Sequence, residues 1–177
     1  MNKTYWPWVF LLAIVLAVTA LVRHFHIRNF HVVRQEVLYA SGQPRGMDYT
    51  RLLYRYHIAT IVNIRSADEH REKNWYNEEI TWIRNNGVNY IELPIPKRPG
   101  YFPDEQTQSR FLEIMADKTK LPVLLHCDSG RKRTPMLTAV WLIKAEDFSI
   151  DDAIEVVEKL NDEPVTDIEK KFLSSLP

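Results

Sequence analysis

VLLHCDSGRKRTP, residues 123–135, passes from an apolar strand through a polar loop into an apolar helix. Open α/β sheets bind ligands at the carboxyl ends of their strands, and Cys127 stands at such an end. The loop leads into the N-terminus of the predicted helix, where unpaired backbone N–H groups and the helix dipole attract an anion. The sequence therefore predicts an anion site that begins at Cys127.

The side chains in this stretch suit that site. Gly130 lets the backbone curl around a phosphate-sized ligand, and Arg133 can return to the mouth of the loop and bind two oxygens with its planar fork. The helix N-terminus and the neighbouring cations should keep Cys127 as a thiolate at neutral pH. We expect Thr134 to donate a hydrogen bond to the sulfur, and His126 to fix the loop from inside the domain.

The chain around this stretch alternates short apolar runs with amphipathic segments. Strands are predicted at residues 59–64, 89–93 and 121–126. Helices are predicted from the capping box at Ser66 to Gly87, at about 104–118 and 134–144, and after Ser149 and Thr166. This order predicts an α/β fold with a mostly parallel central sheet flanked by helices.

The first segment is different, because residues 6–22 (WPWVFLLAIVLAVTALV) carry no charge. The pattern predicts one N-terminal transmembrane helix, and a cleaved signal peptide is the alternative. Three arginines follow the segment and one lysine precedes it, so the positive-inside rule places the following domain in the cytoplasm of a single-pass membrane protein. We therefore divide the chain into residues 1–28, a membrane anchor with its juxtamembrane segment, and residues 29–177, one folded domain.

Composition excludes several classes of protein. Lysine plus arginine equals aspartate plus glutamate at 23 each, so there is no basic excess of the kind that accompanies nucleic-acid binding. The single cysteine can form neither an internal disulfide nor the thiolate cluster of a structural zinc site. The six histidines lack the paired spacing of a zinc hydrolase. We expect no metal and no cofactor.

The segment HCDSGRKRT resembles the HC-x-x-G-x-x-R-[S/T] signature of protein tyrosine and dual-specificity phosphatases, and LYASGQP at residues 38–44 resembles the compact bacterial dual-specificity branch. The resemblance covers about residues 37–160. It implies hydrolysis of phosphomonoesters through a phosphocysteine on Cys127, with Arg133 holding the transferring phosphoryl group. The backbone that lines the phosphate would then come from Asp128, Ser129, Gly130, Arg131 and Lys132.

This family also uses an aspartate as general acid to protonate the leaving oxygen. Asp104 is the only aspartate between Leu93 and Phe111, which makes it the candidate. Pro103 suits a first helical position, however, so Asp104 is equally well explained as a residue that complements the dipole of the next helix.

The substrate is open between two classes. Phosphotyrosine and phosphoserine or phosphothreonine proteins are the first. Inositol phosphates or phospholipid headgroups are the second, because some relatives with similarly basic loops act on them. Here Arg131 and Lys132 add positive charge to the loop, and Lys97 and Arg98 add more nearby. Two other functions remain as alternatives: an inactive phosphate-binding module and a rhodanese-like sulfurtransferase.

Overall fold

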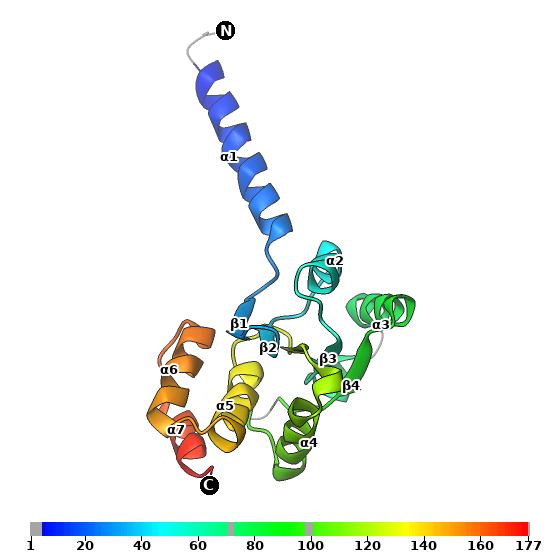
Figure 1. Cartoon of the computed structure of the whole chain (residues 1–177). Coiled ribbons are helices and arrows are strands. Elements are labelled where there is room, and N and C mark those ends of the chain that lie inside the picture. The colour runs from blue at the N-terminus through cyan, green and yellow to red at the C-terminus, as the bar shows by residue number, and fades with distance from the viewer. Residues whose placement is uncertain (1–4, 71–72, 98–100, 177) are drawn as a thin grey trace.

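The computed structural model describes residues 5–70, 73–97 and 101–176. Its centre is a five-stranded sheet in the order β1-β2-β5-β3-β4 (Figure 1). The strands are β1 (His31–Arg34), β2 (Leu38–Ser41), β3 (Thr60–Asn63), β4 (Asn89–Glu92) and β5 (Val123–His126). β2, β5, β3 and β4 pair in parallel, whereas β1 pairs with β2 in the antiparallel sense. The sheet is therefore mixed.

Helices cover both faces of the sheet (Figure 1). α2 (Met47–Tyr54) and α3 (Asn74–Asn86) lie on one face. The other face carries α4 (Glu105–Ala116), α5 (Arg133–Ala145), α6 (Ile150–Asn161) and α7 (Asp167–Ser174). Neighbouring residues of a strand point to opposite faces. In β5, accordingly, Val123 and Leu125 pack on the α5 side and Leu124 on the α3 side.

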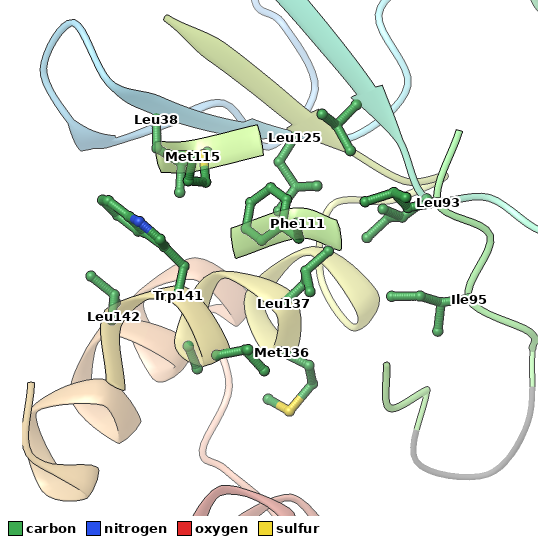
Figure 2. Close-up of a cluster of buried hydrophobic side chains, with 14 of the residues drawn as sticks. Leu38, Leu93, Ile95, Phe111, Met115, Leu125, Met136, Leu137, Trp141 and Leu142 are labelled. Carbon is green, nitrogen blue, oxygen red and sulfur yellow. The ribbon is translucent and has the colours of Figure 1, made fainter. Parts of the chain in front are cut away.

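The larger core lies between the sheet and α4 and α5 (Figure 2). Leu125 from β5 meets Phe111 of α4 and Leu137 of α5, and all three side chains are fully buried. α5 is nearly continuously buried from Arg133 to Leu142. The helix that follows Cys127 is thus fixed in the core, and this fixes the position of the loop before it.

The helix predicted to open at Ser66 needs a correction. The capping box is present, but it closes only a 3-10 turn, η1 (Ala67–Glu69). The α-helix proper begins at Asn74 and ends, as predicted, at Gly87, which is left-handed with φ 65°. A second 3-10 turn, η2 (Lys118–Lys120), follows α4.

The apolar N-terminal segment forms α1 (Trp6–Phe25), which extends away from the sheet (Figure 1). In the described part of the chain, however, no helix combines the length and apolarity that a membrane span requires. The uncharged run of residues 6–22 is about 25 Å long as a helix, against about 30 Å for a hydrocarbon core. The predicted transmembrane helix, and the single-pass membrane localisation derived from it, are therefore wrong.

Candidate active site

The loop from Cys127 to Arg133, which we call the signature loop, begins directly after β5 and ends in the first turn of α5. The backbone N–H of Gly130 donates a hydrogen bond to Cys127 Sγ over 3.2 Å. Cys127 is only 2% exposed, at the base of the loop. The sulfur therefore receives a backbone N–H from the loop that leads into the N-terminus of α5.

Two glycines let the signature loop pack closely on the end of β2. Gly130 has φ +78°, and a Cβ there would come within 2.6 Å of Gly42 N and of Ser41 C. A Cβ on Gly42 would in turn lie 2.9 Å from Ser129 O. The N–H of Gln43 donates to Asp128 O over 3.0 Å and joins the two segments. Side chains at either glycine would push the loop away from β2.

Arg133 is held in place from several sides and is 3% exposed. Its guanidinium donates to both carboxylate oxygens of Glu69, with 3.1 Å between Nη2 and Oε1. Nη1 also lies 3.3 Å from Ile95 O and 3.5 Å from Ile64 O. These contacts fix the orientation of the Arg133 guanidinium.

Glu69 can accept the hydrogen bonds of Arg133 as a carboxylate because its surroundings stabilise its negative charge. Burial alone would raise the pKa of its carboxyl, but hydrogen bonds from Arg133 and Ser66 outweigh burial and hold the pKa well below its ordinary value. The ammonium of Lys97 lies 3.5 Å from Glu69 Oε1 and is half exposed. The same glutamate thus closes the capping box of η1 and clamps the arginine of the signature loop.

Arg65, two residues beyond β3, connects the signature loop with its surroundings. Its Nη1 donates to Gln43 Oε1 over 3.2 Å and lies 3.6 Å from Asp128 Oδ1. Its guanidinium carbon lies 3.7 Å from the centre of the Trp75 ring, at the distance of a cation–π contact. Its Nε lies 3.3 Å from Glu69 Oε1. Arg65 therefore links Gln43, Glu69 and the signature loop residue Asp128.

Behind the signature loop lies a buried carboxylate, Glu79 of α3, with no exposed surface. His126 Nε2 lies 3.1 Å from its Oε1, and His126 Nδ1 lies 3.4 Å from Cys127 O. Four further polar groups surround the two oxygens at 3.0–3.3 Å, namely those of Gln43, Tyr49, Asn63 and Tyr90. Burial would raise the pKa of Glu79, but His126 and these donors lower it on balance.

Comparison with known proteins agrees with this geometry. Residues 22–174 match the family described as "DSP-PTPase phosphatase fused to NAD+ Kinase". The chain belongs to this family of phosphatases. A curated relative, the dual specificity protein phosphatase TpbA of Pseudomonas aeruginosa, is 24% identical over 122 residues, which are 69% of this chain and 50% of TpbA. The match thus spans about half the length of that relative.

Solved structures show the same fold for the DSP-PTPase domain. The catalytic core of the PP-IP phosphatase SIW14 from S. cerevisiae, in complex with citrate, has a TM-score of 0.70 at 18% identity and covers 85% of this chain and 86% of its own. PTPMT1 in complex with PI(5)P has a TM-score of 0.67 at 17% identity, and the match covers 83% of this chain and 93% of the PTPMT1 chain. At identities of 17–18%, the similarity to these structures establishes the fold alone.

The other residues predicted for the DSP-PTPase site lie as follows. The hydroxyl of Thr134 is buried and, among the residues the structure describes, has no hydrogen-bond partner. Arg131 is exposed. The Nζ atom of Lys132 lies 3.3 Å from Oε2 of Glu163. Asp104 is exposed and caps α4, accepting the N–H of Thr107 over 2.8 Å. Arg98 lies outside the described residues.

Sequence analysis missed four residues that surround the signature loop in the candidate site: Gln43, Arg65, Glu69 and Glu79. A signal was available for two of them, because Gln43 and Arg65 follow the carboxyl ends of β2 and β3, the two neighbours of β5. Parallel strands bring such residues together at one edge of the sheet. Glu69 and Glu79 gave no comparable signal, because only the folded chain brings them to Arg133 and His126.

Proposed function

We propose that the chain hydrolyses phosphomonoesters in two steps at Cys127. In the first step the thiolate attacks phosphorus and the bond to the leaving oxygen breaks, which gives a phosphocysteine. In the second step a water molecule attacks the phosphocysteine and the P–S bond breaks, which releases inorganic phosphate and the thiolate. Arg133 and the N–H groups of residues 128–132 bind the equatorial oxygens, where negative charge accumulates.

One observation carries this proposal: the guanidinium of Arg133 is already fixed by Glu69, at the end of the loop whose Gly130 N–H meets Cys127 Sγ. A nucleophile, an anion cradle and a bidentate cation thus belong to one short segment. A sulfurtransferase has no need of an arginine held in this way. The membership in a family of phosphatases supports the same chemistry.

The proposed general acid is Asp104. It would protonate the leaving oxygen in the first step and accept a proton from water in the second. Its hydrogen bond to Thr107 shows that it also serves as the N-cap of α4.

The test is hydrolysis of an aryl phosphate by the full chain in the presence of EDTA. Wild type should turn over and Cys127→Ser should lose all measurable activity, because the alcohol is not ionised at neutral pH. Glu155→Gln, at an exposed position of α6, is the matched control and should retain the wild-type rate. If the folded wild type binds inorganic phosphate without turnover, the chain is a phosphate-binding module and the proposal fails.

A further inference from the structure

Glu79 is a fully buried carboxylate that the proposed reaction does not use. It belongs to α3, which covers one face of the sheet. Because side chains alternate along a strand, His126 of β5 points to this face, whereas its neighbour Leu125 packs on the α5 side. Nε2 of His126 lies 3.1 Å from Oε1 of Glu79, and neither side chain has exposed surface. The pair therefore lies directly behind the residue that carries the nucleophile.

Four side chains donate hydrogen bonds to the Glu79 carboxylate. Oε1 accepts from the amide of Gln43 over 3.0 Å and from the hydroxyl of Tyr49 over 3.3 Å. Oε2 accepts from the amide of Asn63 over 3.1 Å and from the hydroxyl of Tyr90 over 3.3 Å. These donors favour the ionised carboxylate, and a buried negative charge is stable only beside a positive partner.

The imidazole of His126 can supply that positive charge. Its Nε2 faces the carboxylate of Glu79, and its Nδ1 lies 3.4 Å from the backbone oxygen of Cys127. Both of these oxygens can only accept a hydrogen bond. A neutral imidazole carries one N–H and can donate to one of them, whereas an imidazolium donates to both. The geometry therefore fits a doubly protonated His126.

The carbonyl of Cys127 determines the direction of the next backbone N–H. The peptide bond between Cys127 and Asp128 is trans, and in a planar trans peptide the C=O and the N–H point in opposite directions. A Cys127 carbonyl held toward His126 thus turns the N–H of Asp128 away from His126. The carbonyl of Asp128 is held separately, because it accepts the N–H of Gln43 over 3.0 Å.

We propose that Glu79 is a positioning residue for phosphoryl transfer at Cys127: it keeps His126 doubly protonated, and His126 holds the Cys127 carbonyl so that the Asp128 N–H binds a phosphoryl oxygen. This inference rests on the proposed function. Glu79 itself touches neither the sulfur nor the substrate. A backbone donor contributes most where negative charge accumulates in the transition state, so kcat should depend on Glu79 more than KM does.

The first experiment observes the ring nitrogens of His126 by ¹H–¹⁵N NMR of the full-length protein at neutral pH. Wild type should show two protonated ring nitrogens, in signals identified by their absence from His126→Asn. Glu79→Gln should show one, because a neutral amide does not stabilise the imidazolium. Tyr90→Phe is the matched control and should keep both protons, since it removes a donor from Oε2 and leaves Oε1 facing His126. A singly protonated His126 in wild type would overturn the proposal, whether or not the variants fold.

The second experiment measures kcat and KM on an aryl phosphate and the Kd of inorganic phosphate, with folding checked by circular dichroism. Glu79→Gln should lower kcat at least about tenfold, raise KM by a smaller factor and weaken phosphate binding at least about threefold. Tyr90→Phe also loses a buried hydrogen bond, but its kcat should stay within about twofold of wild type. Equal kcat values for the two folded variants would mean that Glu79 contributes to stability alone.

The two proposals fail in different ways. Wild type that binds inorganic phosphate but leaves the ester intact refutes the proposed function. Wild type that turns over, together with a folded Glu79→Gln of unchanged kcat and phosphate affinity, refutes this inference alone.

Discussion

Single residues in this domain serve the fold and the site together. Glu69 closes a capping box with Ser66 and clamps Arg133, and Gln43 joins β2 to the signature loop and to Glu79. Such residues are hard to assign from sequence, because the local pattern already explains them. The capping box predicted at Ser66 is present, although it opens a 3-10 turn and not an α-helix. The contact between Glu69 and Arg133 appears only in the folded chain.

Asp104→Asn separates the two roles of that residue. Asparagine is as good an N-cap as aspartate, so α4 and the stability of the domain should be preserved. A missing general acid should lower kcat about 10²-fold on phenyl phosphate, whose leaving group needs a proton, and much less on p-nitrophenyl phosphate. Steady-state kinetics on both esters check this. If the two rates change by the same small factor, Asp104 is a cap alone.

Glu79→Gln tests the buried carboxylate behind the signature loop. The amide of glutamine would turn a donor toward groups that now donate to Glu79, so at least one buried donor loses its partner. We expect a loss of about 1–3 kcal/mol in the free energy of unfolding, measured by urea denaturation. Glu155→Gln, on the surface of α6, should be neutral within about 0.5 kcal/mol. Equal midpoints for the two variants would show that the network contributes nothing.

At the scale of elements, the site depends on how the signature loop fits against the end of β2. Gly130 and Gly42 face each other there, and neither position has room for a Cβ. The predicted loop around an anion required glycine at position 130 alone. The need for Gly42 comes from the pairing of β2 with β5, which sequence analysis did not identify.

Gly130→Ala and Gly87→Ala form a matched pair at this scale. Both glycines have positive φ, 78° and 65°, but a Cβ at Gly87 meets open space. Gly87→Ala should cost about 1 kcal/mol for the left-handed backbone and leave turnover intact. Gly130→Ala should cost the same free energy for the left-handed backbone. It should also displace the signature loop, so kcat on an aryl phosphate should fall more than about 100-fold. Comparable kcat values would show that the close packing is irrelevant to the site.

At the scale of the whole molecule, the sequence predicted an α/β fold, and an α/β fold is found, but with a mixed sheet. The runs at 59–64, 89–93 and 121–126 correspond to β3, β4 and β5. β3 and β5 are fully buried, as expected for the central strands of a mostly parallel sheet. The hairpin of β1 and β2 was not predicted; β1 alternates between partly buried and exposed residues and so lacks a continuous apolar run. The apolar N-terminal run correctly predicted a helix but wrongly a transmembrane one.

The candidate site was predictable where its residues are contiguous. Residues 126–134 form one loop and helix start, so their spacing alone placed Cys127, Gly130 and Arg133 together. Contacts across the chain were not predictable in this way, because the strand order β2-β5-β3 decides which loop ends meet.

Acid stability reports on both buried carboxylates at once. The pKa values of Glu69 and Glu79 lie below the ordinary value of 4.5 in the folded chain. Below about pH 4.5 the unfolded chain therefore binds more protons than the folded one, and the free energy of unfolding must fall as the pH falls. Above about pH 6 both groups are ionised in either state, and they add no slope.

The measurement is a series of urea midpoints between about pH 7 and pH 3. Wild type should hold its stability down to about pH 4.5, as far as these two groups decide it, and lose it progressively below. Glu69→Gln and Glu79→Gln start lower at neutral pH, but each should lose less between about pH 4.5 and pH 3, because one titrating group is gone. Glu155→Gln should follow wild type. Parallel curves for all four proteins would mean that neither carboxyl has a lowered pKa, and that the contact with Arg133 does not stabilise the charged form of Glu69 over its neutral form.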